Sequence, residues 1–492
     1  MLHPNHRCFL LQAGLAATLF LAGRPLPAAA AETPARKPNF IVILIDDMGW
    51  RDIGANGSQT YKTPNIDKLA AQGMRFTQGY AACAVCSPTR AALMCGKYPA
   101  RLHITDWISG EGTPKQSKFK VPDWTMQLPL EEITIAEVLK QQGYATASIG
   151  KWHLGGGKFL PEHQGFDLNV AGGHIGHPAS YFWPYGGPKD GHRVPGLSEA
   201  GGKDGEYLTD RLTAEALRFI GANQNKPFFL YLPHYAVHGP LMGKPEYVKE
   251  AENTPVLDEQ KNHVYAAMVR SVDDSIGEIM KSLEQLKLDE NTVVIFTSDN
   301  GGVIHAGKPP ATSNLPLRAG KGYPYEGGIR EPLIIKAPGI AKPGSVCDAP
   351  TITMDFFPTI AALAGVPEAG KTAIDGKDLT PLLKGAPKLD RDTLCWHYPH
   401  YWAGKVITPY SIIRSGDLKL IHWYENDTWE LYNIADDLGE KNDLAAQQPE
   451  KVAELRAKLE AWLKETGAQL PVPRPAEPIE PAKKKNAPKK AK

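Results

Sequence analysis

The amino-acid sequence predicts an α/β protein in which helices sandwich a large, mostly parallel sheet, followed by a smaller C-terminal subdomain with an antiparallel sheet and a closing helix. Short apolar runs alternate with helical patterns through most of the chain, which is the order that parallel sheets require. Near the C-terminus, short strand patterns follow one another with only turns between them. The length of 492 residues exceeds what one core usually holds, so a large and a small unit are expected.

Four apolar runs are each followed by polar residues suited to a functional site. A continuous apolar run is typical of a strand that is buried on both faces. The runs and the polar residues after them are 40–45 with Asp46 and Asp47, 145–149 with Lys151 and His153, 228–232 with His238, and 292–297 with Asp299 and Asn300. Ligands bind outside the carboxyl ends of parallel strands, so the four clusters are predicted to converge on one pocket. Taken alone, each cluster is equally well explained by a turn, a cap or a structural histidine.

Local signals mark the helices between these strands and the elements of the C-terminal subdomain. Thr134 and Glu137 form a capping box, and Gly143 ends the helix that they begin. Another helix is expected over 63–73. In the C-terminal part, the predicted strands are 411–414, 418–423 and 429–432, and the predicted helix is 449–465.

The pentapeptide Cys86-Ser87-Pro88-Thr89-Arg90 has the pattern of a helix start. Ser87 is expected to cap the free amide groups, and Pro88 fits the first helical position. Cys86 would then lie beside a helix N-terminus, where free N–H donors and the helix dipole favour an anion. A reactive group held against an oxyanion is one interpretation, and a buried cysteine before an ordinary capped helix is the other.

The pattern Cys86-x-Pro88-x-Arg90 resembles the signature of the type I sulfatases of the alkaline phosphatase superfamily, among them arylsulfatases and bacterial carbohydrate sulfatases. The resemblance extends over about 39–439, with the motifs in the family's order. It implies a sulfuric ester hydrolase in which a formylglycine-generating enzyme converts Cys86 to Cα-formylglycine. The chain departs from the family at Cys95, where threonine is usual.

A hard divalent cation is expected at the predicted pocket. Asp46, Asp47, Asp299 and Asn300 offer carboxylate and amide oxygens, which suit Ca²⁺ or Mg²⁺ and disfavour zinc. The resemblance implies that these four residues are the ligands, with residue 86 also near the metal. It also implies Ca²⁺, while the residues alone leave Mg²⁺ open.

The family resemblance assigns roles to the remaining polar residues. One hydroxyl of the hydrated aldehyde at position 86 would attack sulfur and expel the substrate alcohol. His238 and Lys321 would protonate or stabilise the leaving oxygen, and His153 would act as the base when sulfate departs. The groups implied to neutralise the sulfonyl oxygens are Arg90, Lys151 and Lys321.

Three segments rich in aromatic residues and histidine, 101–107, 172–177 and 396–402, are candidate sugar-binding regions. Aromatic faces with polar neighbours suit a sugar ring, although the same residues would also seal the interface between the subdomains. The predicted substrate-binding residues are Lys151, His238, Lys321, His103, His174, His177 and His400. Similarity to bacterial carbohydrate sulfatases implies a sulfated glycan, and a galactose or N-acetylgalactosamine 4-sulfate is the narrowest expectation.

The expected organisation is a signal peptide over 1–31, a catalytic domain over 37–385, a C-terminal subdomain over 390–468 and a disordered Lys/Pro-rich tail over 471–492. The signal peptide and the lack of a later apolar span predict an exported protein, periplasmic or extracellular. Removal of Cys8 with the signal leaves an odd number of cysteines, so at least one is expected outside a disulfide. A net charge of +1 gives no argument for nucleic-acid binding.

Two alternative functions remain compatible with the sequence. A phosphonate monoester or phosphodiester hydrolase would share the fold and bind a similar oxyanion. A non-catalytic glycan-binding protein would leave Cys86 unconverted, although it would need few of the metal and acid–base candidates.

Overall fold

The computed structural model describes residues 36–186, 191–197, 200–305, 307–367, 374–402, 404 and 406–474. The described residues from Lys37 onward belong to one compact unit. The expected signal peptide over 1–31 lies outside the described residues. No helix in the described ranges is both long and apolar enough to span a bilayer.

Nine strands of the described chain form the large sheet, in the order β10-β2-β8-β7-β1-β6-β4-β5 with β9 beside β2. Only β8 runs antiparallel to its neighbours, β2 and β7, which confirms the prediction of a mostly parallel sheet. The strands are β1 (Asn39–Ile45), β2 (Met74–Tyr80), β4 (Ala145–Ile149), β5 (Leu168–Val170), β6 (Phe228–Pro233), β7 (Thr292–Ser298), β8 (Arg330–Lys336), β9 (Ser345–Cys347) and β10 (Thr351–Ile352).

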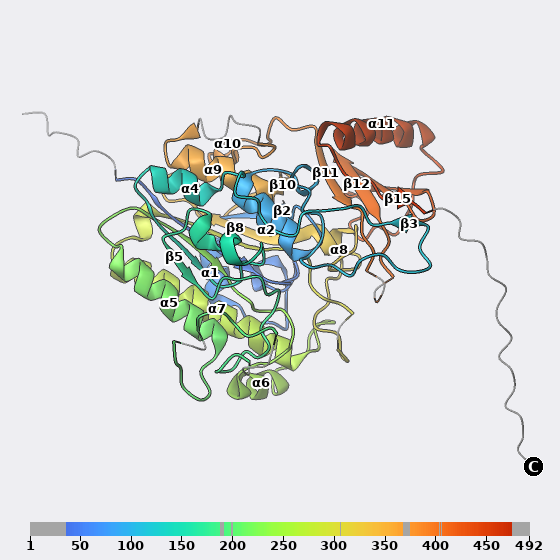
Figure 1. Cartoon of the computed structure of the whole chain (residues 1–492). Helices are drawn as coiled ribbons and strands as arrows, with labels where there is room; N and C mark the ends of the chain where they lie inside the picture. The colour runs from blue at the N-terminus through green and yellow to red at the C-terminus, as the bar shows by residue number, and fades with distance from the viewer. Residues whose placement is uncertain are drawn as a thin grey trace, which may run out of the picture. The chain divides into compact units, whose positions relative to one another are not determined.

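Helices cover both faces of this sheet, as expected for continuously apolar strands (Figure 1). One face packs against α1 (Pro64–Gln72), α5 (Leu208–Ala222) and α7 (His263–Gln285). The opposite face packs against α2 (Cys86–Cys95), α4 (Ile135–Gln141) and α9 (Phe356–Leu363). The shorter helices are α3 (Pro99–Leu102), α6 (Pro245–Glu252), α8 (Glu326–Ile329), α10 (Thr380–Leu383) and the 3₁₀ turns η1 (Gly54–Asn56), η2 (Gly157–Phe159), η3 (Pro161–His163), η4 (Asp289–Asn291) and η5 (Thr353–Asp355).

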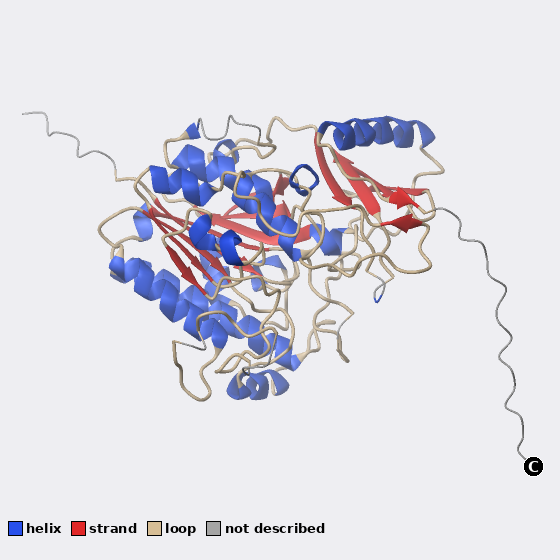
Figure 2. Cartoon of the chain, viewed as in Figure 1, coloured by secondary structure: helices blue, strands red, loops and turns tan. Residues whose placement is uncertain are grey.

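A second, antiparallel sheet in the order β11-β12-β13-β14 stands beside the large one and carries helix α11 on its outer face (Figure 2). Its elements are β11 (Thr393–Tyr398), β12 (Tyr410–Ser415), β13 (Leu418–Trp423), β14 (Thr428–Asn433) and α11 (Pro449–Glu465). The inner face shares a hydrophobic cluster with the large sheet, where the rings of Tyr80 and Trp396 lie 5.5 Å apart. The predicted antiparallel sheet and closing helix are confirmed, and β11 is an additional strand.

The first residues of the expected tail over 471–492 are described, and they contact the rest of the chain. Strand β15 (Val472–Pro473) pairs with β3 (Phe119–Lys120), and the Arg474 guanidinium donates to the carbonyls of Pro114 and Lys115. These backbone and guanidinium bonds hold a segment that composition alone assigned to the solvent. Residues 475–492 lie outside the described ranges.

Candidate active site

The polar clusters that follow four strands meet at one edge of the large sheet. Strands β7, β1, β6 and β4 are consecutive neighbours and run parallel, so their carboxyl ends lie together. After β4, the chain turns at Gly150, whose φ is +125°. A side chain there would place its Cβ 2.0 Å from the carbonyl oxygen of Pro233, so only glycine lets the ends of β4 and β6 approach this closely.

The acidic residues at this edge form one buried cluster. The Asn300 amide donates to Asp47 Oδ1 at 2.7 Å, and the Asp47 N–H donates to Asp299 Oδ1 at 3.2 Å. Ligand atoms of Asp46, Cys86 and Asp299 lie within 4.8 Å of one another. Asp47 adopts a left-handed backbone with φ of +64°, a strained conformation that is concentrated at functional sites.

Three cations surround these carboxylates. The Arg90 guanidinium donates to Asp299 Oδ2 at 2.7 and 2.9 Å, and the Lys151 ammonium donates to Asp46 Oδ2 at 2.6 Å. Lys321 Nζ lies 2.5 Å from Asp47 Oδ1. Arg90 and Lys151 are fully buried, so their positive charge faces the carboxylates. Each cation thus fixes the position of one acidic side chain.

The donor set fits a hard cation. Among the described groups, Asp46 Oδ1 and Asn300 Oδ1 are buried oxygens without any hydrogen-bond partner. Buried oxygens in this state are rare in native proteins because each costs about 1–3 kcal/mol unless a partner, water or ion satisfies it. Asp46, Asp47, Asp299 and Asn300 would therefore hold Ca²⁺ or Mg²⁺, whose preferred ligands are oxygens.

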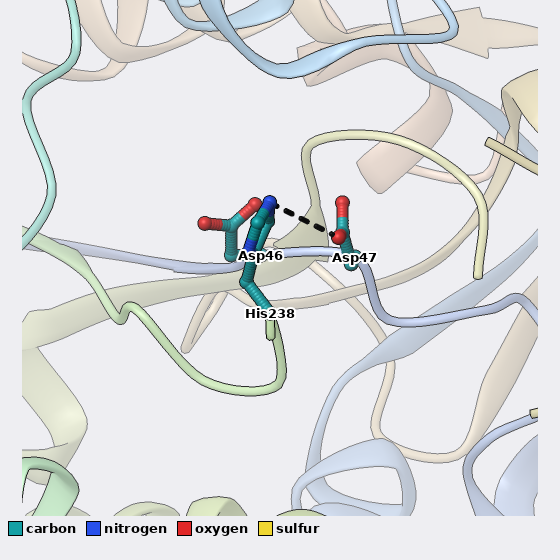
Figure 3. Close-up of side chains that lie close together, drawn as sticks. All are labelled: Asp46, Asp47 and His238. Carbon is teal, nitrogen blue, oxygen red and sulfur yellow. Dashed lines mark ion pairs between the residues drawn. The ribbon is translucent and has the colours of Figure 1, made fainter. Parts of the chain in front are cut away.

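Neighbouring charges drive the pKa values of the two adjacent aspartates in opposite directions. Burial, followed by the charge of Asp299, raises the pKa of Asp46 to about 8. Burial also acts to raise the pKa of Asp47, but Lys321 and His238 outweigh it and hold that pKa below its ordinary value. Figure 3 shows Asp46, Asp47 and His238 side by side, with His238 Nε2 3.5 Å from Asp47 Oδ2. This environment disfavours the ionised form of Asp46, and a bound cation would favour that form.

Helix α2 begins at Cys86, which lies at the helix N-terminus as predicted, although Ser87 is not the cap. The N-cap is Val85, which makes no side-chain cap hydrogen bond. The Ser87 hydroxyl instead donates to the carbonyl of His153 at 2.9 Å and accepts from the N–H of Ile108 at 3.1 Å. Helical geometry starts two residues earlier than a Ser cap would require, so Ser87 links two loops of the site.

Cys86 is buried beside Lys321, whose Nζ lies 3.8 Å from its sulfur. Burial raises the pKa of the Cys86 thiol. The five cysteines of the described chain are all free and buried. Cys86 and Cys95 occupy opposite ends of a 10-residue helix, about 13 Å apart along its axis, which is too far for a disulfide.

The backbone fixes the tautomer of His153. Its Nε2 lies 2.5 Å from the carbonyl of Ile108, which can only accept, so Nε2 carries the proton. Burial, with the charge of Lys151, lowers the pKa of His153 well below its ordinary value. Nδ1 is buried and has no partner among the described atoms. The neutral ring therefore offers the lone pair of Nδ1 as a base.

His238 and Lys321 differ in protonation. His238 Nδ1 donates to the carbonyl of Gly239 at 2.9 Å, and burial lowers the pKa of this residue to about 3 despite Asp47. Burial also acts to lower the pKa of Lys321, but the charge of Asp47 outweighs it and raises that pKa. In this state of the site, Lys321 is the group that holds a proton.

A cavity of about 450 Å³ opens onto these residues. The predicted site residues that line it are Asp47, Cys86, His153, His177, His238 and Lys321. Trp107 and Trp402, which lie in the predicted aromatic segments, also line it. His192 and His305 also line it and were not predicted: His192 is a single histidine in a loop far from the motifs, and His305 follows Asn300 by five residues but matches no recognised pattern.

Some predicted residues lie behind the cavity or away from it. Arg90 and Lys151 contact carboxylates and do not line the cavity. His103 Nε2 lies 3.1 Å from the carbonyl of Gly467, and His174 lines a separate cavity of about 600 Å³. His400 is buried with its Nε2 2.7 Å from Thr105 Oγ1. The structure thus places these three histidines outside the catalytic cavity. The rings of His103 and His400 contact other parts of the fold, and His174 borders a different cavity.

Comparisons with known proteins agree on one family. Residues 38–366 match the sulfatase family model, and residues 320–469 match the model described as N-sulphoglucosamine sulphohydrolase, C-terminal. Arylsulfatase A of Homo sapiens is 37% identical over 400 residues, which cover 76% of this chain and 73% of the relative. N-acetylgalactosamine-6-sulfatase of Canis lupus familiaris is 34% identical, with 84% and 76% covered.

A solved structure extends the similarity to the fold. The structure described as Ps i-CgsB in complex with k-i-k-neocarrahexaose has a TM-score of 0.73 and 30% identity to this chain. The match covers 88% of this chain and 94% of that one. The similarity therefore extends over most of the chain.

Proposed function

Because this chain belongs to the sulfatase family and is a sulfuric ester hydrolase, we propose that it is an exported enzyme that removes sulfate from carbohydrates by means of a formylglycine at position 86 and a bound divalent cation. The observation that carries the proposal is the position of Cys86. It begins helix α2, within 4.8 Å of carboxylate oxygens of Asp46 and Asp299 and 3.8 Å from Lys321. A nucleophile at this point is adjacent to both the proposed cation and a protonated amine.

The cation would be held by Asp46, Asp47, Asp299 and Asn300, with Ca²⁺ favoured by the family resemblance and Mg²⁺ as the alternative. When bound, it supplies positive charge that stabilises an anionic nucleophile and the sulfate oxygens. The two buried oxygens without partners, on Asp46 and Asn300, support this assignment.

The residues around position 86 divide the proton transfers between them. Once formed, the modified residue 86 would supply the nucleophilic hydroxyl, and Lys321 is positioned to stabilise the oxygen that leaves with the sugar. His153, whose Nδ1 is free to accept a proton, would act as the base at residue 86. His238 would assist at the leaving oxygen only after its Nε2, which lies beside Asp47, gains a second proton that the neutral ring lacks. Arg90 and Lys151 hold the carboxylates in place from behind.

The burial of Cys86 determines when its modification would occur. The side chain is 3% exposed, so an enzyme that generates formylglycine would have to reach it before α2 packs. The modifying enzyme is therefore a partner of the unfolded chain.

The proposed substrate is a sulfated galactose or N-acetylgalactosamine unit of a glycan. The 4-sulfate is our expectation from the sequence, and the name of the canine relative adds the 6-sulfate as a candidate. Trp107 and Trp402 in the cavity wall offer aromatic faces to a sugar ring. Phosphonate monoester or phosphodiester hydrolysis is the less favoured reaction, since the relatives named above are sulfatases.

Mass spectrometry of the peptide that contains residue 86 tests the proposal. The native protein is expected to carry the aldehyde and to release sulfate from galactose 4-sulfate or 6-sulfate faster than it releases phosphate from matched phosphodiesters. Metal analysis of the same sample is expected to find one divalent ion for each chain. An active protein with unmodified cysteine, or one that prefers phosphodiesters, would refute the mechanism.

A further inference from the structure

Three imidazole rings stack along one wall of the catalytic cavity. The centroids of His177 and His192 lie 3.9 Å apart with planes 18° apart, and those of His177 and His238 lie 5.6 Å apart with planes 5° apart. All three residues line the cavity together with Asp47 and Cys86. The first ring, His238, is the one beside Asp47, so the stack leads away from the reacting centre.

The hydrogen bonds of His177 determine what its ring offers to a ligand. Its Nδ1 lies 3.1 Å from the carbonyl of Pro178, and because a carbonyl only accepts, Nδ1 must carry the proton. In the neutral ring, Nε2 is then left with a lone pair and no proton.

Burial and neighbouring positive charge both favour the neutral form of the His177 ring. Burial lowers the pKa of His177, and the nearby His192, Lys151 and Lys321 add to this effect, while the bond to Pro178 opposes it. A neutral ring in this tautomer accepts a hydrogen bond at Nε2 and cannot donate one there.

Building on the proposed function, we propose that His177 is a specificity-determining residue whose Nε2 accepts a hydrogen bond from a free hydroxyl of the sugar beside the sulfate ester. In the stack, His238 lies beside the reacting centre and His177 lies one ring further away. On the sugar, the hydroxyl next to the sulfate ester likewise lies one position further from the reacting centre than the ester oxygen. His192 acts as a positioning residue, because its stacking fixes the plane of the His177 ring.

This arrangement selects against particular substrates. A sugar that carries hydrogen in place of the hydroxyl leaves Nε2 without its donor. A sugar with a second sulfate at that position presents only acceptor oxygens and negative charge to a lone pair. The preferred substrate class is therefore a sugar sulfate with a free hydroxyl next to the ester that is cleaved.

Paired substrates test the requirement for the hydroxyl. The probes are methyl galactoside 4-sulfate with its 3-deoxy analogue and methyl galactoside 6-sulfate with its 4-deoxy analogue. For the regioisomer that is cleaved faster, we expect kcat/KM to fall roughly 10- to 100-fold on loss of the hydroxyl, the cost of one unpaired polar group. In His177→Phe, the ratio of kcat/KM between the parent sulfate and its deoxy analogue should approach one. In His177→Gln, whose amide oxygen reaches towards the position of Nε2, part of that ratio should return. His163→Phe, at an exposed position, should retain the full ratio.

A binding measurement separates this inference from the proposed function. Calorimetric titration of Cys86→Ala with the same probe pairs is expected to show Kd values that differ roughly 10- to 100-fold. Equal Kd values within both pairs, or a ratio that persists in His177→Phe, would overturn the role of His177 whether or not the enzyme turns over. Conversely, a wild-type protein with confirmed formylglycine that releases no sulfate would overturn the proposed function, while a difference in Kd would still support the role of His177.

Discussion

Two buried clusters of charge in this chain are built on opposite principles. In the closed cluster, Lys419 donates to Glu326 at 3.0 Å and to Glu440 at 2.9 Å, between the two sheets. The remaining carboxylate oxygens accept from the Tyr80 hydroxyl, the Arg330 guanidinium and the backbone N–H of Glu326. In the open cluster at the strand ends, Asp46 Oδ1 and Asn300 Oδ1 have no partner among the described groups.

This difference indicates that the closed cluster serves the fold and that the open cluster serves ligand binding. A buried network in which every oxygen is satisfied leaves nothing for a ligand to bind, and it joins the two sheets. A network that leaves buried oxygens unpaired is costly in the empty protein and gains stability when a cation supplies the missing contacts. The open cluster therefore lowers the stability of the protein without its cation and provides the binding site for that cation.

The largest expected effect comes from the open cluster. Asp46→Asn removes a proposed cation ligand and the partner of Lys151, so kcat is expected to fall by more than about 10⁴-fold. The free energy of unfolding in chelator should change little, because the variant also removes the repulsion between Asp46 and Asp299. Steady-state kinetics with a sulfate ester and urea unfolding measure the two quantities. Loss of stability in step with activity would show that this cluster is structural.

Lys419→Met tests the closed cluster. It removes the cation that lies between Glu326 and Glu440 and leaves Glu440 without its ion-pair partner, and the free energy of unfolding is expected to fall by about 3–5 kcal/mol. Lys451→Met, which breaks an exposed pair with Glu454, is the matched control and should leave unfolding unchanged. Urea denaturation of both variants provides the comparison, and equal stability would mean that the closed cluster does not join the sheets.

The closed cluster also predicts a pH dependence. Burial acts to raise the pKa of Glu326, but Lys419 and Arg330 outweigh it and lower that pKa from 4.5 to about 2. A lowered pKa in the folded state stabilises above the unfolded pKa, and this contribution is lost as pH falls from 4.5 towards 2. Wild-type protein should thus lose stability more steeply in that window than Glu326→Gln. Urea unfolding at several pH values measures this. If the free energy of unfolding changed equally with pH in both proteins, the prediction would be wrong.

Chelation gives the smallest expected effect. Removal of a cation present at 100 times its Kd lowers the free energy of unfolding by about 2.7 kcal/mol. Thermal unfolding of the wild type should respond to chelator and recover with Ca²⁺ or Mg²⁺, whereas Asp46→Asn should not respond. A wild-type protein that is insensitive to chelator would remove the distinction between the two clusters.

Much of the site was predictable because it depends on local patterns and one general rule. Apolar runs define β1, β4, β6 and β7, and parallel strands place their carboxyl ends at one edge. The convergence of Asp46, Lys151 and Asp299 follows from these two facts. Lys321 was assigned only through family resemblance, because a long loop separates it from β7.

The sequence by itself determined the four central strands β1, β4, β6 and β7, the polar residues that follow them and the helix that begins at Cys86. Only the tertiary structure decided which histidines face the cavity, bringing in His192 and His305 and leaving out His103 and His400. The physical reason is the separation along the chain over which each kind of interaction acts. Periodicity and capping act over a few neighbouring residues, whereas the direction of a loop side chain depends on contacts with segments hundreds of residues away.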